Sequence, residues 1–335
     1  MRILLVKLSS LGDVVHTLPV VQDILMALPD AQIDWVVEKA FAPLLTQVQG
    51  LQRIVPCELR RWRRSIFAAQ TGREWRAFKA DLQTANYDAV IDLQGLTKSA
   101  LVARLARLTK NGKRYAMANQ TDGSGYEAPT RWVADVAIAM VPQIHAVARA
   151  RQFAAKALDY DIDGLEIAPN YGIEVPESQL MRGQKAPKVV AFIHGTSRQD
   201  KTWMLQNWVE LGQRLVTNGY QAALVHGSGK ELETSLAIAA QLRGNCIVWP
   251  LLSLDALTQQ LATCQGAIGV DSGVSHIAVA LGLPHVQIYN FATAWRTGPL
   301  GAAHQVSVFD KTGQGTSPTV DAVWQSWLQC QGGLP

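Results

Sequence analysis

The stretch VKLSSLGDVVHTLPV, from Val6 to Val20, predicts a strand that passes through a polar turn into a helix. It overlaps the end of RILLV, a short apolar run with branched residues that is typical of a buried strand. Pro19 either kinks the helix or marks its true start. The apolar residues of the helix fall on one face, and they are Leu18, Val21, Leu25 and Leu28. A strand followed closely by a helix is the repeating unit of an α/β sheet.

The acid in this turn has two possible roles. Asp13 follows Gly12 and falls near the first turn of the helix, where free N–H groups and the helix dipole stabilise an anion. It is either an ordinary helix cap or a carboxylate that is kept ionised for chemistry. Position alone leaves both roles open.

Length and composition indicate a globular protein of about two domains. The chain has 335 residues, of which 48% are hydrophobic and 17% charged, and this balance excludes a disordered protein. The best candidate for a membrane span, WVADVAIAMV, is shorter than the ~18 residues required and contains Asp135. Lys7 and Asp13 break the N-terminal apolar run and no small-residue cleavage site follows, so we expect no signal peptide.

Metal binding is not expected. The sequence DYDIDG, from Asp159 to Gly164, resembles the start of a calcium loop but has Asn170 where a bidentate glutamate is needed. Four cysteines are scattered without metal or redox spacing, namely Cys57, Cys246, Cys264 and Cys330. Such cysteines are typical of buried thiols in a reducing compartment, which predicts a cytoplasmic protein.

Strands alternate with helices in two blocks, which predicts two doubly wound parallel sheets. The first block contains RILLV, AQIDWVVE and YDAVIDLQG, and the second contains KVVAFI, YQAALV, CIVWP, GAIGV and PHVQIYN. A segment rich in glycine, proline and polar residues separates the blocks. We predict an N-terminal domain at 1–165, a linker at 166–186, a C-terminal domain at 187–318, and a final helix and tail at 319–335.

Polar turns follow several of these strands, and open α/β sheets bind ligands at the carboxyl ends of their strands. In VDSGVSHIAVALG, a strand delivers Asp271, Ser272 and Gly273 to a helix start, and we expect His276, one turn later, at the exposed mouth of this site. Helix N-termini bind anions, so the motif predicts a diphosphate site, with a plain capped helix as the alternative.

Two further turns of the second block have suitable chemistry for a nucleotide. The turn FIHGTSRQDKTW supplies two hydroxyls and two bases, which favour phosphate, with a charged surface loop as the alternative. The turn HGSGKE is only a partial dinucleotide fingerprint and is not a P-loop. Its Glu231 is placed to hold a ribose hydroxyl.

The sequence ELRRWRRSIF, from Glu58 to Phe67, places four arginines around one tryptophan. These arginines are Arg60, Arg61, Arg63 and Arg64. Like charges so close together repel one another unless an anion is near, and guanidinium groups suit phosphate and carboxylate. We therefore favour an anion site over a solvated loop. A nucleic-acid surface is disfavoured, because base stacking needs several exposed aromatic residues.

Six motifs together resemble the lipopolysaccharide heptosyltransferases: SSLGDVVHTLP, IDWVVE, RRWRR, DLQGLTKSA, GTSRQDKTW and DSGVSHIAVALG. The resemblance extends from Met1 to about Leu300, with the motifs in family order. It implies two facing Rossmann-like domains, the GT-B arrangement. It also implies an inverting, metal-independent enzyme that moves L-glycero-D-manno-heptose from ADP-heptose to a Kdo sugar of lipid A. Another GT-B sugar-nucleotide enzyme, such as a different glycosyltransferase or an epimerase, is the alternative.

The resemblance further implies roles for individual residues. Asp13 corresponds to the catalytic base, and Lys201 would neutralise the diphosphate leaving group. The residues implied on the donor side are Ser10, Thr196, Ser197, Lys201, Glu231, Leu252, Asp271, Ser272, Gly273 and His276. The residues implied on the acceptor side are Lys7, Arg60, Arg61, Arg63 and Lys98.

The expected partners follow from the same resemblance. They are the donor ADP-heptose, a Kdo-bearing lipid A acceptor and the surface of the inner membrane, with no cofactor and no nucleic acid. We expect a monomer in the cytoplasm that is peripheral on the inner face of the cytoplasmic membrane. The mild net charge of +4 is compatible with such a surface.

Overall fold

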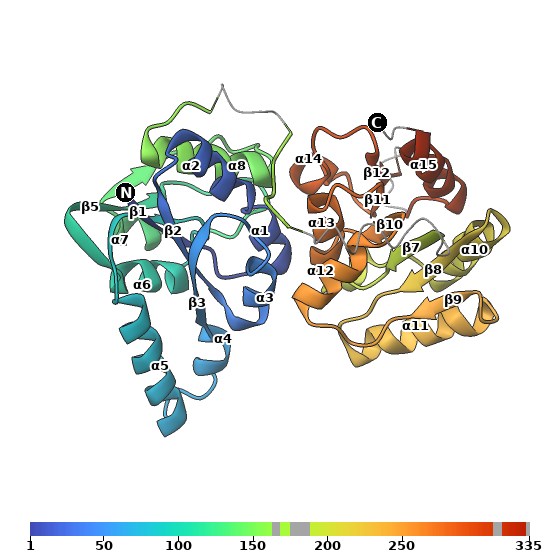
Figure 1. Ribbon diagram of the computed structural model, residues 1–335, viewed down its shortest axis with the longest axis horizontal. Helices are drawn as coiled ribbons and strands as arrows, with labels where there is room; N and C mark the ends of the chain where they lie inside the picture. The colour runs from blue at the N-terminus through green and yellow to red at the C-terminus, as the bar shows by residue number, and fades with distance from the viewer. Residues whose placement is uncertain (163–167, 175–187, 311–316, 333–335) are drawn as a thin grey trace. The chain divides into compact units, whose positions relative to one another are not determined.

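The computed structural model describes residues 1–162, 168–174, 188–310 and 317–332. The chain divides into two compact units (Figure 1). The first contains the described residues up to 162 together with 170–172, and the second contains 168–169 and the described residues from 173 onward. Most of the predicted linker, 166–186, lies outside the described residues, so the domain boundaries stay predictions.

The first unit contains a six-stranded sheet with the order β3-β2-β1-β4-β5-β6, in which every neighbouring pair is parallel. Its strands are β1 (Arg2–Val6), β2 (Gln32–Glu38), β3 (Leu51–Cys57), β4 (Asn86–Asp92), β5 (Arg107–Met117) and β6 (Val136–Ile138). Its helices are α1 (Leu11–Val15), α2 (Pro19–Ala27), η1 (Lys39–Phe41), α3 (Ala42–Leu45), α4 (Leu59–Trp62), α5 (Ala69–Leu82), α6 (Thr97–Leu105), α7 (Thr130–Val133) and α8 (Ala146–Leu158).

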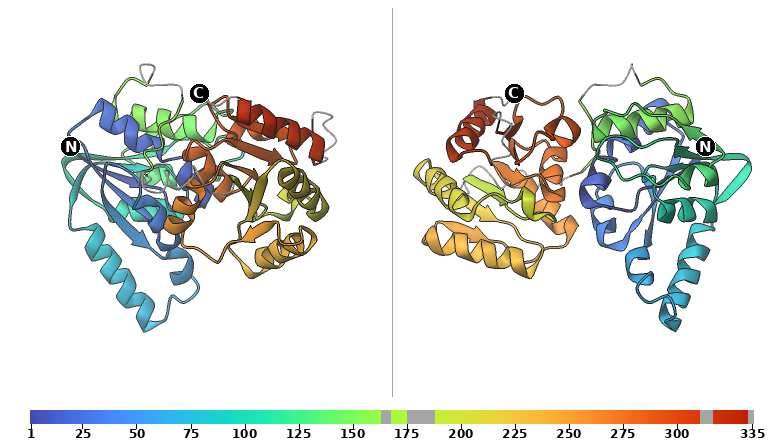
Figure 2. Two further views of the ribbon diagram at one scale, coloured as in Figure 1. Left: turned by 45° about the vertical axis from the view of Figure 1, so that its right-hand side comes forward. Right: turned by 180° about the vertical axis from the view of Figure 1, so that it is seen from behind.

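Helices cover both faces of this sheet. Leu4 and Val6 of β1 pack in one apolar cluster with Trp62 of α4 and Phe78 of α5. Helices α2 and α8 pack against each other and lie on the opposite face (Figure 2). Pro19 is the first residue of α2, so it marks the start of a helix and does not kink one.

The sequence prediction missed three strands of this sheet. Strand β3 lies at the sheet edge and includes Pro56, which an edge strand tolerates because proline lacks an N–H group. Strand β5 carries four lysines and arginines and is only partly buried, so its composition resembles a loop. Strand β6 has three residues and occupies the middle of WVADVAIAMV, the apolar segment that is too short to span a membrane.

The second unit contains another six-stranded parallel sheet, with the order β12-β11-β10-β7-β8-β9. Its strands are β7 (Lys188–Ile193), β8 (Tyr220–Leu224), β9 (Cys246–Val248), β10 (Gly266–Val270), β11 (His285–Tyr289) and β12 (Gln305–Phe309). Its helices are η3 (Gln199–Lys201), α10 (Leu205–Thr217), α11 (Gly229–Gln241), α12 (Leu254–Ala262), α13 (Gly273–Ala280), α14 (Ala294–Thr297) and α15 (Val320–Gly332).

The final helix, α15, packs on the sheet of the second unit. Its Val323 and Trp327 are fully buried in a cluster with Phe192 of β7 and Trp208 of α10. Strand β12, which the sequence prediction also missed, lies at the sheet edge beside β11 and contacts this helix. The C-terminal helix therefore completes the core of the second unit.

Both sheets have the same strand order when each is counted from its own first strand. The order reverses between β1 and β4 in the first unit, and between β7 and β10 in the second. A reversal of this kind leaves a crevice at the carboxyl ends of the two central strands, where doubly wound folds bind ligands. The predicted pair of doubly wound domains is confirmed, and most of the predicted site residues follow these four strands.

Candidate active site

The turn after β1 positions Asp13 through the start of α1. Ser10 is the N-cap residue, with an extended backbone, and Asp13 is the third residue of the helix. The Oδ2 atom of Asp13 accepts hydrogen bonds from the Ser10 backbone N at 3.0 Å and from Ser10 Oγ at 2.8 Å. Ser10 is therefore the N-cap, and Asp13 is the acidic partner in a capping box, in which Ser10 holds the Asp13 carboxylate in place.

Two buried cations act on the Asp13 carboxylate. Burial alone would raise the pKa of Asp13, but the charges of Lys7 and Arg149 and the bonds from Ser10 outweigh it and lower the pKa. Lys7 follows β1 directly and its Nζ donates to the backbone oxygen of Leu93 at 2.9 Å. Asp13 is thus an ionised carboxylate at neutral pH.

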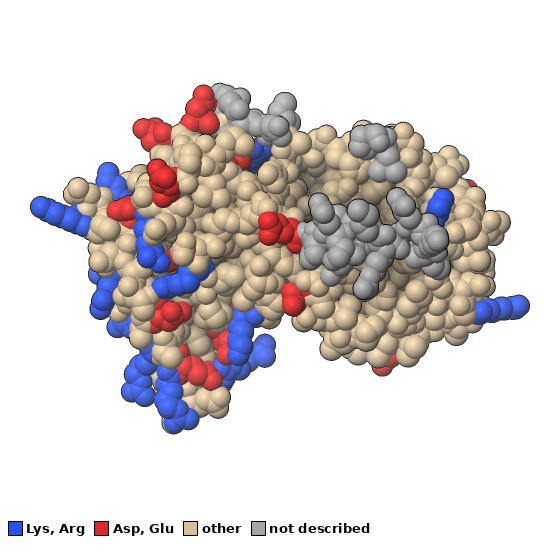
Figure 3. All heavy atoms as spheres, viewed as in Figure 1, with Lys and Arg blue, Asp and Glu red and all other residues tan. Residues whose placement is uncertain are grey.

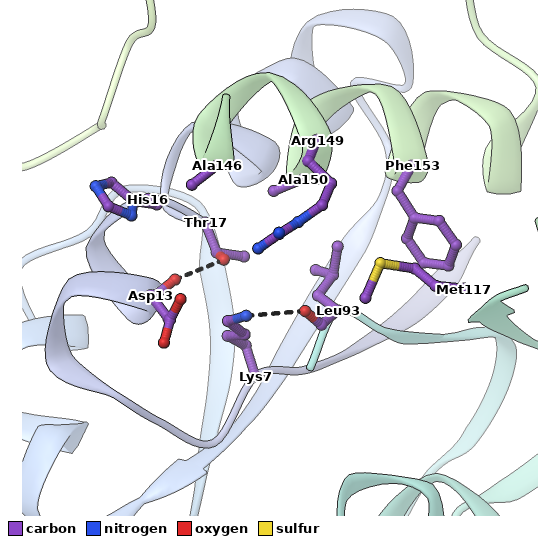
Figure 4. Close-up of a pocket in the computed structure, with 10 residues that line it drawn as sticks. All are labelled: Lys7, Asp13, His16, Thr17, Leu93, Met117, Ala146, Arg149, Ala150 and Phe153. Carbon is purple, nitrogen blue, oxygen red and sulfur yellow. Dashed lines mark hydrogen bonds between the residues drawn. The ribbon is translucent and has the colours of Figure 1, made fainter. Parts of the chain in front are cut away.

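These three charged residues line one pocket of the first unit (Figure 4). Figure 4 shows the side chains of Lys7 and Arg149 directed into the space beside Asp13, each from a different element. The remaining lining residues are His16, Thr17, Leu93, Met117, Ala146, Ala150 and Phe153. The pocket has a volume of about 10 Å³, which is room for about one water molecule, and two cations against one carboxylate give it a positive character.

Arg149 is a site residue that the sequence analysis missed. It lies on α8, is buried, and donates from Nη1 to Thr121 Oγ1 at 2.8 Å. It shares a helical face with Ala146, Ala150 and Phe153, which line the same pocket. An arginine on an otherwise apolar helical face is a usable signal, because a buried charge requires a partner or a ligand.

Hydrogen bonds from the turn after β1 to the turn after β4 hold the two turns together. The Oε1 atom of Gln94 accepts hydrogen bonds from the backbone N of Leu8 and of Ser9, each at 3.1 Å. Asp92 is buried and accepts from two backbone N–H groups at 3.0 and 3.2 Å and from Ser99 Oγ at 2.9 Å. Burial nevertheless raises the pKa of Asp92 to about 6. These bonds fix the backbone on which Lys7 and Asp13 stand.

In the second unit, the ends of β7 and β10 bring three predicted donor residues together. Lys201 ends the short helix η3, and its Nζ lies 2.5 Å from Oδ2 of Asp271, which follows β10. The hydroxyl of Thr196 donates to the backbone oxygen of Asp271 at 3.3 Å. Burial would raise the pKa of Asp271, but His276 and Lys201 lower it strongly. Asp271 is therefore ionised and paired.

Helix α13 begins at the predicted place, but His276 differs from the expectation. Ser272 is the N-cap, and its side chain accepts a hydrogen bond from the Ser275 backbone N at 3.4 Å. His276 is buried and does not lie at an exposed mouth. Its Nε2 is 3.4 Å from Asp271 Oδ1, and its Nδ1 is 3.5 Å from Gln287 Nε2. One turn into the helix, this side chain meets β10 and β11, so it positions Asp271.

A second pocket lies in the second unit at the end of β7. It is lined by Thr196, Trp203, Lys230 and Glu231, among other residues. The Oε2 atom of Glu231 accepts a hydrogen bond from the Gly227 backbone N at 2.6 Å. Gly195 leaves room for this carboxylate, because a Cβ atom there would approach Glu231 Cδ within 2.5 Å. The predicted ribose partner thus faces a pocket of suitable polarity.

Two predicted donor residues stand outside this arrangement. Ser197 is exposed in the turn after β7, and Leu252 is half-buried before α12. Neither residue lines the pocket of Glu231. Their donor roles stay predictions.

The arginine cluster lies on α4 and in the turn after it, and its four arginines are exposed. Arg61 is paired within the protein, with Glu58 at 2.9 Å and with Glu74. Arg60 and Arg63 have no ion pair among the residues that the structure describes. The structure therefore favours a structural role for Arg61, which joins α4 to α5, and leaves Arg60 and Arg63 for a ligand.

Lys98 lies between the arginine cluster and the turn after β1 that carries Asp13. Its Nζ donates to Ser9 Oγ at 3.1 Å. Burial and the neighbouring charges of Arg60 and Arg63 lower the pKa of Lys98, although Glu38 opposes them. A line of positive charge therefore runs from the arginine cluster toward the turn that carries Asp13.

Two other features are absent from the described ranges. No three histidine, cysteine, aspartate or glutamate side chains in that part of the chain gather as metal ligands. No helix there is both long and apolar enough to cross a bilayer.

Comparison with known proteins places the chain in a family. A family model described as Glycosyltransferase family 9 (heptosyltransferase) matches residues 75–321. The chain is also 36% identical over 307 residues to lipopolysaccharide heptosyltransferase 1 of Pseudomonas aeruginosa, a match that covers 90% of this chain and 82% of that protein. The chain belongs to glycosyltransferase family 9, the heptosyltransferases.

Further relatives and solved structures support the assignment of this chain to family 9. Lipopolysaccharide heptosyltransferase 1 of Escherichia coli strain K12 is 36% identical over 294 residues, covering 86% of this chain and 88% of that protein. The solved structure of E. coli heptosyltransferase WaaC with ADP has a TM-score of 0.86 and 32% identity, and covers 98% of this chain and 100% of that chain. The same enzyme with ADP-2-deoxy-2-fluoro heptose has a TM-score of 0.80. The predicted family and GT-B fold are confirmed.

Proposed function

We propose that this heptosyltransferase moves L-glycero-D-manno-heptose from ADP-heptose to a Kdo sugar of lipid A, with inversion and without a metal. The names of the relatives, lipopolysaccharide heptosyltransferase 1, and the heptose analogue bound to WaaC support this donor and this pathway. The observation that carries the proposal is the ionised Asp13 carboxylate in a positively charged pocket at the end of β1.

In this mechanism Asp13 is the general base. Its carboxylate takes the proton of the acceptor hydroxyl while that oxygen forms a bond to the anomeric carbon of the heptose. The bond from the anomeric carbon to the diphosphate breaks, and its electron pair leaves with ADP. Attack on the face opposite the leaving group inverts the anomeric centre. The lowered pKa of Asp13 keeps the carboxylate deprotonated before the acceptor arrives.

The second unit supplies the groups for the ADP part of the donor. The N-terminus of α13 and the ammonium of Lys201 stabilise the negative charge that grows on the diphosphate as the bond breaks. Glu231 accepts a hydrogen bond from a ribose hydroxyl, as acids after such strands do. Lys201 is paired with Asp271 in the structure, so the diphosphate must share this ammonium with the carboxylate.

The first unit supplies the groups for the acceptor. Kdo carries a carboxylate and lipid A carries phosphates, and the positive charges of Lys7 and Arg149 beside Asp13 attract both groups. Arg60, Arg63 and Lys98 extend this positive surface away from the pocket. A lipid-linked acceptor places the reaction at the inner face of the cytoplasmic membrane.

One experiment tests the proposed function. The purified protein is incubated with ADP-heptose and Kdo-bearing lipid A, and ADP release and acceptor mass are both measured. We expect one ADP for each acceptor that gains one heptose, at the same rate with and without a metal chelator. ADP release without a gain in acceptor mass would indicate a hydrolase or an epimerase and would contradict the proposal.

A further inference from the structure

Helices α4 and α5 form a hairpin whose tip, residues 63–68, presents two apolar side chains to solvent. Phe67 is 96% exposed and Ile66 is 62% exposed. The tip is fastened to α5 by a hydrogen bond of 2.9 Å between the hydroxyls of Ser65 and Thr71. Single exposed apolar side chains are common, but two adjacent ones at the tip of one hairpin form a small patch that calls for an explanation.

The hairpin has its own aromatic core, and Ile66 and Phe67 are not part of it. Trp62 is buried, and its ring centroid lies 5.8 Å from that of Trp75 and 5.7 Å from that of Phe78. Its Nε1 donates to Glu74 Oε2 at 2.7 Å. The core is therefore filled and hydrogen-bonded without Phe67, and the packed hairpin holds the tip in place.

Positive charge surrounds the tip. From residue 59 to residue 73 the chain has five arginines and no acid. Arg63, Arg64 and Arg73 flank the apolar pair, and Arg76 and Lys79 continue along α5 at a spacing of three residues. All five are exposed, and none has an ion pair among the described residues. Figure 3 shows lysine and arginine side chains gathered over this end of the first unit.

We propose that the hairpin tip anchors the protein in an anionic bilayer. Phe67 and Ile66 enter the boundary between headgroups and acyl chains, and the surrounding arginines contact lipid phosphates. Stable but reversible membrane binding takes two signals, an apolar insertion and a basic surface, and the tip carries both. Two apolar side chains are too small a surface for a stable protein partner. The idea extends the proposed function, since it explains how the enzyme reaches a lipid-linked acceptor.

Vesicle binding tests the anchor without donor or acceptor, so its outcome is independent of the transfer reaction. The full chain is sedimented with vesicles of phosphatidylethanolamine and phosphatidylglycerol, and with vesicles of phosphatidylcholine alone. We expect binding to the anionic vesicles only. Phe67→Ser should weaken it roughly tenfold or more, since a phenylalanine leaves the apolar phase, and Phe67→Trp should retain it. Arg64→Gln should weaken it roughly fivefold and reduce its salt dependence.

The matched control is Trp132→Ser, which removes a 73% exposed aromatic residue of the same unit that lies outside the tip. This control should bind vesicles like the wild type. Phe67→Ser should also keep its turnover on a water-soluble acceptor without acyl chains. Equal vesicle binding by Phe67→Ser and the wild type would overturn the proposal. So would concentration-dependent dimers that Phe67→Ser abolishes, because the tip would then join two copies of the chain.

Discussion

At the level of single residues, the proposed chemistry depends on an Asp13 carboxylate that stays ionised beside two buried cations, Lys7 and Arg149. Desolvation raises the pKa of Asp13, and two cations with two hydrogen bonds from Ser10 reverse that effect. Because Lys7 and Arg149 both contribute, neither cation should be fully replaceable by the other. The pH dependence of the reaction reports this balance directly.

Replacing Lys7 by methionine should move the acid limb of the pH profile. In the wild type, the pKa of Asp13 lies below its ordinary value, so this group should not limit kcat/KM between about pH 5 and pH 8. Lys7→Met removes a charge and leaves the burial, which raises the pKa of Asp13 and shifts the limb to higher pH. The measurement is kcat/KM from pH 4 to pH 8 for both proteins. An unmoved limb would show that Lys7 does not set this pKa.

The sequence singled out Asp13 as a candidate because its position after the first strand is local, whereas its role as a base came only from the family resemblance and stays a prediction. Arg149 was missed because it comes from α8, which only the folded chain brings to the end of β1. The internal pairing of Arg61 with Glu74 was missed for the same reason, since α4 and α5 must first form a hairpin. The burial of His276 follows from the register of α13 against β10 and β11, which the motif alone does not fix.

For the secondary-structure elements, residues that follow two neighbouring strands interact in each unit. Substitutions of such residues must therefore be tested both singly and in pairs. Lys201 after β7 and Asp271 after β10 form one ion pair that is largely buried. Removing only the lysine leaves a buried carboxylate without its cation, and this is costly in itself. A single substitution therefore reports two effects at once.

Lys201→Ala should weaken ADP binding by about 1.5–3 kcal/mol, the range of a charge-assisted hydrogen bond, as measured by calorimetry. The unpaired carboxylate of Asp271 would add to this loss by repelling the diphosphate. Comparison of Asp271→Asn with the double variant Asp271→Asn, Lys201→Ala isolates the contribution of the lysine. If Lys201→Ala bound ADP like the wild type, Lys201 would have no role in holding the donor.

Asp92 provides a stability test of the turn after β4. Its pKa in the folded state, about 6, lies above the ordinary value of 3.8, so its contribution to stability is present below about pH 4 and lost as the pH rises through 6. From that difference, the free energy of unfolding of the wild type should fall by up to about 3 kcal/mol between pH 4 and pH 7. Asp92→Asn should not show this fall. Urea unfolding of both proteins at these two pH values measures the effect. Parallel pH dependence of the two proteins would contradict the assignment.

Most strands were predictable from their apolar runs, including the short edge strand β9, whereas β3, β5, β6 and β12 were not. Strands β1, β2, β4, β7, β10 and β11 are buried along most of their length, and each contains a run or a majority of apolar residues. Strands β3, β6 and β12 lie at the edges of their sheets, where water replaces one neighbour, and β5 is paired with the three-residue edge strand β6 over only part of its length. Their composition then follows solvent exposure more than strand propensity.

For the whole molecule, the proposed mechanism gives the two units separate roles. In this proposal the first unit carries the base, the positive pocket and the exposed arginines, and the second carries the groups for the nucleotide. This division predicts that variants of the first unit change acceptor kinetics without changing nucleotide affinity, and that variants of the second do the reverse.

The double variant Arg60→Ala, Arg63→Ala tests the acceptor side and leaves the internal ion pairs of Arg61 intact. We expect a higher KM for the lipid-linked acceptor and a flatter salt dependence, because fewer charges remain to be screened. The KM for ADP-heptose should stay nearly the same. Steady-state kinetics at low and moderate salt give all three quantities. Lost ADP affinity with an unchanged acceptor KM would mean that the two units were assigned the wrong way round.

The most direct test of the central claim is the turnover of Asp13→Asn, measured together with its affinity for ADP. Asparagine keeps the shape of the side chain and an acceptor for the bonds from Ser10, but it cannot take a proton. The account predicts a fall in kcat by about 10² or more, with an ADP dissociation constant close to that of the wild type. Near-normal turnover would contradict the account, because the proton would then be taken by another group.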